Sequence, residues 1–110
     1  CMIVSDSRLK IYFGDARDGI VKSRDCLPSP VPLAGHEKFS PLITGLQATQ
    51  LALLNQTHSA QGMLVIDHVP AFERDGDFLI TAQSRLAIGV LTADCLPIVL
   101  YDQKKHAAAV

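Results

Sequence analysis

A histidine, an acid and a thiol stand out in this sequence as side chains that could carry chemistry. His58 follows an apolar run and is surrounded by polar residues, whereas Asp94 and Cys95 are adjacent within the apolar stretch Leu86–Tyr101. Imidazole and thiolate are ligands of zinc, and both groups also act in acid–base or nucleophilic catalysis. The sequence therefore offers donor types that suit a metal site or a cysteine–histidine hydrolase.

Each of these side chains also has a purely structural interpretation. A lone cysteine in an apolar stretch is commonly a small core residue, an aspartate at a turn caps backbone amides, and a histidine in a polar cluster is often solvated. Two ligands are also too few, because a catalytic zinc normally takes three protein ligands and an open position. His58 and Cys95 are 37 residues apart, so only a sheet that brings two strand ends together would unite them.

The stretch Leu86–Tyr101 is predicted to form two buried strands, Leu86–Leu91 and Leu96–Tyr101. Runs rich in Val, Ile and Leu and bounded by turn-forming residues are typical of such strands. Asp94 and Cys95 would then lie at a joint where solvent is scarce. Because a buried polar group is costly unless it is paired, this placement favours a chemical role.

The rest of the chain is predicted to consist mainly of short strands. Alternation and apolar runs place strands at residues 8–13, 50–55, 63–69, 78–82 and 106–110, with a polar turn at 103–105. Ser40 as an N-cap and Pro41 at the first position predict one or two helical turns over Pro41–Leu46. Residues 23–40 are rich in proline, which cannot donate backbone hydrogen bonds, and are predicted to form an extended surface connection. The expected fold class is α+β, mostly β-sheet.

Composition favours a single, soluble, cytoplasmic domain. Of the 110 residues, 48% are hydrophobic and 19% are charged, and the net charge is -1, as in ordinary globular proteins. The charges form no basic stripe, which argues against nucleic-acid binding, and the apolar runs are far shorter than the ~20 residues that span a bilayer. The three cysteines form no close pair, which favours reduced thiols. No secretory leader is recognisable.

The remaining candidate residues and the end of the chain carry weaker signals. His36, His68, His106 and Cys26 are expected to be surface or structural residues. The sequence contains no glycine-rich phosphate loop, no G-x-S-x-G elbow and no C-x-x-C pair. The last residues, His106–Val110, form an apolar run without a turn or polar tail. We therefore expect residues 1–110 to be the N-terminal part of a longer domain.

Three segments in the second half of the chain resemble motifs of the YfiH-like family. Residues 55–59 (NQTHS) resemble its Q-x-H-[GS] element, residues 76–81 (GDFLIT) its G-D-A-L-V-T strand, and residues 86–98 its T-A-D-C-x-P motif. His106–Val110 is similar to the strand that leads into H-A-G-W-R-G. This family was long described as multicopper polyphenol oxidases or laccase-domain proteins, and more recently as purine nucleoside phosphorylases and adenosine deaminases. The resemblance implies a mostly β, sandwich-like core with few helices.

The resemblance also implies a metal site and a substrate class. In the family, the matching histidine and cysteine hold a metal together with the histidine of H-A-G-W-R-G, which implies that His58 and Cys95 bind Zn²⁺, or alternatively Cu²⁺. The third ligand would fall on the position after Val110. Asp94 would orient the cysteine or transfer a proton. Residues 13–19 resemble a drifted F-x-T-R-x-G-G segment, which would make Arg17 the residue that neutralises phosphate.

The implied chemistry uses small-molecule partners, a purine nucleoside and phosphate. Water would attack C6 of adenosine and release ammonia, or phosphate would attack C1′ of the ribose. With two ligands present, the polypeptide as given is expected to bind metal weakly. Nucleic acid and membrane are not expected as partners, and the oligomeric state stays open.

Four alternatives stay open at this stage. The family's fold also resembles the catalytic domain of cytotoxic necrotising factors, so Cys95 could be the nucleophile of a metal-free Cys–His hydrolase. Amide hydrolysis of peptidoglycan precursors would suit the same zinc site. Polyphenol oxidation fits less well, because it needs many histidines and this chain has four. The chain could also be a truncated relative that serves as an interaction module.

Overall fold

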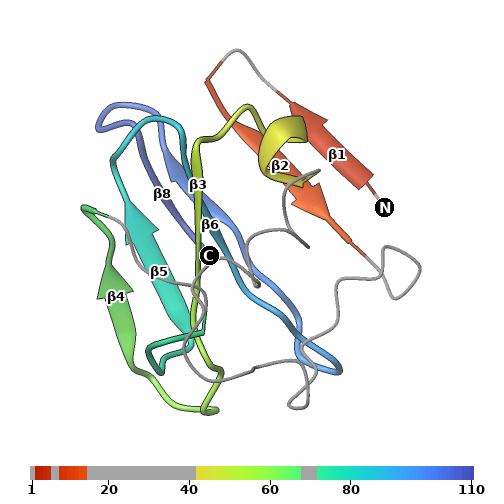
Figure 1. Ribbon diagram of the computed structural model, residues 1–110, viewed down its shortest axis with the longest axis vertical. Helices are drawn as coiled ribbons and strands as arrows, with labels where there is room; N and C mark the ends of the chain where they lie inside the picture. The colour runs from red at the N-terminus through yellow and green to blue at the C-terminus, as the bar shows by residue number, and fades with distance from the viewer. Residues whose placement is uncertain (1, 6–7, 15–41, 68–71) are drawn as a thin grey trace.

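The described part of the chain is built almost entirely from short β-strands. Figure 1 shows the computed structural model, which describes residues 2–5, 8–14, 42–67 and 72–110. Within these ranges, residues 42–45 form a helical turn. The strands are β1 (Met2–Ser5), β2 (Lys10–Phe13), β3 (Gln50–Leu53), β4 (Gly62–Leu64), β5 (Phe78–Thr81), β6 (Leu86–Gly89), β7 (Leu100–Asp102) and β8 (Ala107–Ala109). This composition confirms the predicted mostly β, α+β fold class.

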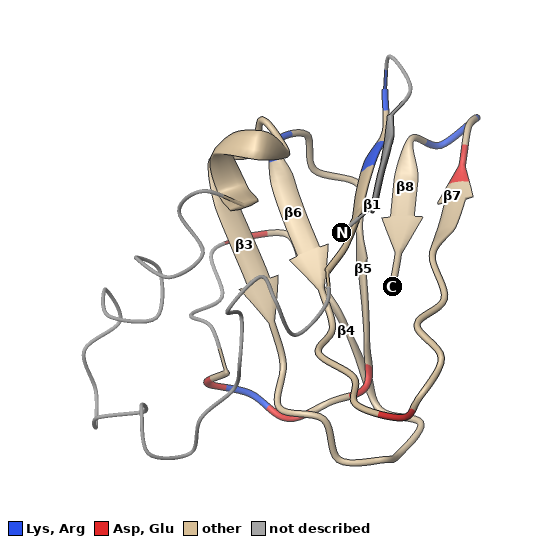
Figure 2. Ribbon diagram, turned by 90° about the vertical axis from the view of Figure 1, so that its right-hand side faces the viewer, with Lys and Arg blue, Asp and Glu red and all other residues tan. Residues whose placement is uncertain are grey.

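The strands are arranged in two pairs and one larger sheet. β1 and β2 pair antiparallel, β3 and β6 pair parallel, and the four-stranded sheet has the order β4-β5-β8-β7. In that sheet β4 and β5 are parallel, whereas β8 is antiparallel to both of its neighbours. Figure 2 shows the β3–β6 pair beside the sheet that contains β5, β8 and β7. The two layers form the sandwich-like core that the family resemblance implied.

The main core lies between the β3–β6 pair and the inner face of the four-stranded sheet. Ala52, Val65 and Leu79 are at most 1% exposed and belong to one cluster with Leu54. Strand β5 alternates, with Leu79 and Thr81 buried and Phe78 and Ile80 exposed. This period of two is expected of a strand with one face on a core and one face outward.

Strand β3 is buried on both of its faces. While Ala52 belongs to the main core, Leu51 and Leu53 form a second cluster that is covered by Leu42 and Ile43 of the helical turn and by other partly buried residues. Burial on both sides explains why residues 51–53 of this strand are continuously apolar in sequence. The predicted helical turn is confirmed at residues 42–45.

Because Leu79 is fully buried, we expect the substitution Leu79→Ala in the full-length protein to lower the free energy of unfolding by about 2–5 kcal/mol. The cost combines lost apolar burial with the cavity that is left behind. Urea denaturation would measure the change. The matched control is Leu100→Ala, because Leu100 is 65% exposed and its truncation is expected to cost about 0.5 kcal/mol or less. Equal losses in the two variants would contradict this assignment of the core.

The stretch Leu86–Tyr101 is less regular and more exposed than predicted. β6 ends at Gly89 and β7 begins only at Leu100, so residues 90–99 connect the two strands. Leu96 is 83% exposed and Ile98 is 62% exposed. Pro97 lies between them and has no N–H to donate to a ladder, so this stretch does not have the character of a central strand. The prediction of two buried strands that meet at a solvent-poor joint is wrong.

The other predicted strands are present but differ at their ends. β4 covers only Gly62–Leu64, although the Val65 N–H still donates to the carbonyl of Ile80 at 2.8 Å. β1 was not predicted. The polar turn is confirmed, since Asp102 Oδ1 accepts hydrogen bonds from the amides of Lys104 and Lys105 at 2.9 and 3.1 Å. The predictions for the proline-rich residues 23–40, Cys26, His36 and His68 lie outside the described residues.

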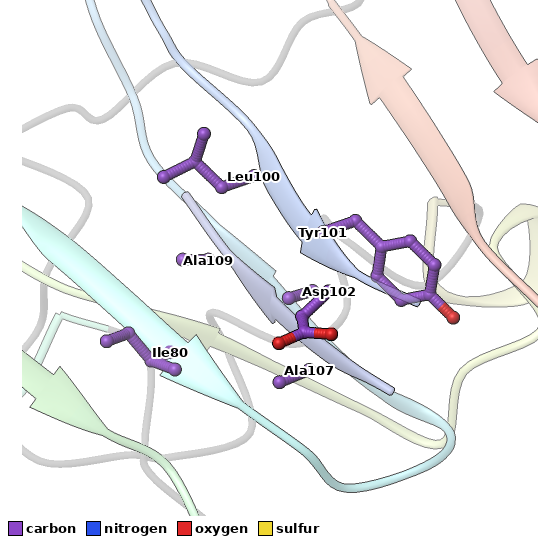
Figure 3. A pocket seen from close by; sticks show the side chains of 7 residues that line it. Ile80, Leu100, Tyr101, Asp102, Ala107 and Ala109 are labelled. Atoms are coloured by element: carbon purple, nitrogen blue, oxygen red, sulfur yellow. The ribbon is translucent and has the colours of Figure 1, made fainter. Parts of the chain in front are cut away.

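The outer face of the four-stranded sheet is apolar. The register places Leu64, Ile80, Ala109 and Leu100 in one row across the four strands. Figure 3 shows Ala109 between Ile80 and Leu100 on the floor of a shallow depression of about 290 Å³. Its lining consists of Ile80, Leu100, Tyr101, Asp102, Ala107, Ala108 and Ala109, and therefore includes none of the candidate functional residues. No helix in the described ranges is long and apolar enough to cross a membrane.

Candidate functional site

The two loops that carry His58 and Cys95 leave their strands at the same end of the molecule. β3 and β6 are parallel neighbours, and Leu53 pairs with Gly89 where both strands end. The chain continues from β3 into residues 54–61 and from β6 into residues 90–99, and both segments lie at the lower end in Figures 1 and 2. Carboxyl ends of neighbouring parallel strands are a common place for functional groups, because loops from different parts of the chain emerge there together.

The candidate side chains at this end are accessible to solvent. His58, Asp94 and Cys95 are all exposed, and Cys95 is a free thiol. An imidazole and a thiol fit the donor types that zinc takes. Among the described residues, however, no group of three His, Cys, Asp or Glu side chains is placed to hold a metal. The ligand roles of His58 and Cys95 and the role of Asp94 stay predictions, and Arg17 lies outside the described residues.

His58 adopts an unusual backbone conformation. Its φ angle is 54°, in the left-handed region that residues other than glycine seldom occupy. Such a conformation persists only where the surrounding structure holds it in place. The contacts of the loop around His58 therefore matter for the site.

Those contacts converge on the carboxylate of Asp77. Oδ1 accepts hydrogen bonds from the amides of Thr57 (3.1 Å) and His58 (2.8 Å). Oδ2 accepts hydrogen bonds from the Ser59 amide (2.8 Å) and from the hydroxyls of Thr57 (3.0 Å) and Ser59 (2.5 Å). These hydrogen bonds hold the pKa of Asp77 well below its usual range, because they stabilise the ionised carboxylate. The hydroxyl of Ser59 contributes most, followed by the Ser59 amide and the two donors of Thr57. Partial desolvation of the carboxylate opposes this shift.

Asp77 is the residue that the sequence analysis missed. It appeared there only as a letter in the G-D-F-L-I-T segment, just before β5, and no chemical role was assigned to it. The available signal was a charged residue at a strand start within a segment that resembles a family motif. Its partners, 18 to 20 residues earlier in the chain, are not visible from sequence spacing.

The loop is also tied to the segment before Asp77 at its two ends. The amide of Asn55 donates to the Arg74 carbonyl (2.8 Å), and the Gly76 amide donates to the Asn55 carbonyl (2.9 Å). At the other end, the Asp77 amide donates to the Gln61 carbonyl (2.8 Å). Glycine suits position 76, because its φ of +157° is a conformation that L side chains rarely adopt and a Cβ there would lie 3.3 Å from the Gln61 carbonyl oxygen. Residues 55–61 thus form a loop that is held along its length.

The profile of a family described as multi-copper polyphenol oxidoreductase laccase matches residues 36–110, a region that includes His58, Asp77, Asp94 and Cys95. No solved structure shows significant similarity to the chain.

Several curated proteins are similar to this chain, and three of them, each named purine nucleoside phosphorylase, come from Clostridium acetobutylicum, Mycobacterium bovis and Corynebacterium glutamicum. The protein from Clostridium acetobutylicum is 28% identical over 108 residues, which are 94% of this chain and 41% of that protein. The relative from Mycobacterium bovis is 32% identical over 80 residues, covering 73% of this chain and 32% of that protein. The relative from Corynebacterium glutamicum is 41% identical over 79 residues, covering 66% of this chain and 30% of that protein. The chain therefore spans less than half the length of these relatives.

Proposed function

Since the chain belongs to the multi-copper polyphenol oxidoreductase laccase family, we propose that the protein of which it is part is a zinc-dependent purine nucleoside phosphorylase. The match confirms the resemblance to the YfiH-like, laccase-domain family. The observation that carries the proposed reaction is the shared name of the three relatives, purine nucleoside phosphorylase. The common end of β3 and β6 supports it, because loops with an imidazole and a thiol emerge there together.

In this proposal His58 and Cys95 hold the metal, and a further ligand comes from outside the described residues. A bound zinc ion would supply Lewis-acid polarisation of an oxygen atom in the site. Asp94, next to Cys95, would orient that ligand or move a proton. Arg17 would neutralise phosphate, a role that suits the fixed positive charge and forked donors of a guanidinium group.

Phosphorolysis sets the chemical requirements of the site. The bond between C1′ of the ribose and the purine nitrogen breaks, a bond from C1′ to a phosphate oxygen forms, and the departing base takes up a proton. Adenosine deamination makes a different demand, since water replaces the amino group at C6 and ammonia leaves. An accessible site with proton-transferring side chains suits either reaction, so the two must be separated by assay.

The test is an assay of the full-length protein with inosine and adenosine, each with and without phosphate. Phosphate-dependent release of hypoxanthine from inosine is the expected result. Ammonia released from adenosine without phosphate would add adenosine deamination. If neither nucleoside is converted by the zinc-loaded protein, the proposed function is wrong.

Polyphenol oxidation is the second candidate, because the description of the matched family names it. With four histidines in this chain, the ligands for several copper ions would have to come largely from elsewhere in the protein. Oxygen uptake with a polyphenol by the copper-loaded protein, at a rate well above that of nucleoside conversion, would favour this candidate over the first.

A further inference from the structure

We infer that Asp77 is a positioning residue, which fixes the backbone of residues 57–59 and thereby the direction in which the imidazole of His58 points. The part of this inference that concerns His58 as a ligand rests on the proposed function. The hold of Asp77 on the loop does not rest on the proposed function, because it follows from the hydrogen bonds alone.

Three consecutive backbone amides converge on one carboxylate. The N–H groups of Thr57, His58 and Ser59 all point at Asp77. Three fixed backbone donors leave the peptide planes on either side of His58 little freedom to rotate. These contacts explain how His58 is kept at a φ of 54°. Because the backbone of a residue sets the direction of its Cα–Cβ bond, the same contacts also fix the point from which the imidazole extends.

The Asp77 carboxylate is itself held by a rigid part of the backbone. Asp77 directly precedes β5, where Leu79 is fully buried. Its own amide is bonded to Gln61, and the neighbouring Gly76 amide is bonded to Asn55. An aspartate side chain has only two torsions between this frame and its oxygens. The position of the His58 loop is therefore tied to the sheet through Asp77.

Only an ionised carboxylate of this length suits position 77. Both oxygens accept hydrogen bonds, and a carboxylate is an acceptor with no donor hydrogen. An asparagine would keep one acceptor oxygen but would turn an NH₂ group toward the other donors. The hydroxyls of Thr57 and Ser59 can rotate to accept from it, but the amide of Ser59 cannot. A glutamate would keep the charge and displace it by one methylene group.

The experiment compares Asp77→Asn with Asp75→Asn in the full-length protein. Asp75 is an exposed acid in the same segment that bridges to Asn55 through its backbone, so its substitution removes an equal charge and leaves the loop contacts in place. Amide hydrogen exchange at residues 57–59 and zinc affinity by chelator competition are measured in each variant. Asp77→Glu, which keeps the charge but displaces the carboxylate by one methylene group, provides a milder change if Asp77→Asn does not fold.

For Asp77→Asn we expect exchange at residues 57–59 to rise at least tenfold, while exchange at residues 51–53 of β3 is unchanged. Zinc affinity should fall about 10- to 100-fold, the usual effect of removing a group that orients a metal ligand, and higher zinc concentrations should restore activity. Asp75→Asn should change neither quantity by more than about twofold. Asp77→Glu should recover less than half of the lost affinity.

The two measurements separate failure of this inference from failure of the proposed function. Unchanged exchange at residues 57–59 in Asp77→Asn, or in Asp77→Glu if that variant must be used, overturns the hold of Asp77 on the loop whether or not zinc binds. Raised exchange with unaltered zinc affinity, in a protein that does bind zinc, overturns the positioning of a ligand. If the unmodified protein binds no zinc, the proposed function fails, and raised exchange still supports the structural role.

Discussion

Under the proposed function, replacing Cys95 with serine in the full-length protein should abolish zinc binding and lower phosphorolysis by at least about 100-fold, the upper end of what loss of an outer partner of a metal ligand costs. The reason is chemical, because a thiolate forms near neutral pH and binds zinc strongly, whereas a serine hydroxyl stays protonated and is a poor ligand. Because Cys95 is exposed, the substitution leaves no cavity in the core, and the fold should be retained. Zinc content by elemental analysis and the rate of phosphate-dependent base release are the two measurements.

Cys26→Ser is the control for this variant, since it removes a thiol to which no role in the site is assigned. It should keep its zinc and its activity. The informative contrary result is a metal-free protein that is active and is inactivated by alkylation at Cys95. That outcome would replace the ligand role of Cys95 with a nucleophilic one, as in a cysteine–histidine hydrolase.

The substitution His58→Ala should have an effect of similar size, because it removes the second of the two predicted ligands. We expect at least about 100-fold weaker zinc binding and a comparable loss of activity. His106→Ala is a closely matched control: both histidines are exposed, and their φ angles are 54° and 52°. The pair therefore separates the loss of a ligand from the effect of replacing a histidine in a left-handed conformation.

A zinc affinity that falls equally in both histidine variants would show that the effect is not specific to the predicted ligand. Retention of full zinc affinity in His58→Ala would remove His58 from the site altogether. Either result could be obtained without an activity assay, so the ligand assignment can be tested even if the substrate is not a nucleoside.

Much of the strand content could be predicted from the sequence because local patterns decide it. Residues 51–53 of β3 are continuously apolar because the strand is buried on both faces, and β5 alternates because it is buried on one. The stretch Leu86–Tyr101 was misjudged because the prediction equated apolar residues with buried ones. Leu96 and Ile98 are apolar yet exposed, and Pro97 between them has no N–H to donate to a ladder. Apolar character alone does not indicate a partner that covers it.

The candidate site could be predicted only in part, because its assembly depends on pairings that are distant in sequence. The donor types at His58 and Cys95 are visible in the sequence. The parallel register that sends their loops to one end is a property of the β3–β6 pair. Asp77 looks like an ordinary turn residue in sequence. Its role becomes visible only in the structure, where amides of another loop donate hydrogen bonds to its carboxylate. No local propensity describes such a contact.

The parallel pairing of β3 with β6 has a consequence for the kinetics of folding. Gln50 pairs with Leu86, so the chain must close a loop of 36 residues, with the entropy cost of that closure, before this ladder forms. Pairings of this kind give a high contact order and slow folding. The loops that carry His58 and Cys95 reach the same end of the protein only after this step. A zinc ion held by both would bind the native state far better than the unfolded chain, and would shift the folding equilibrium by mass action.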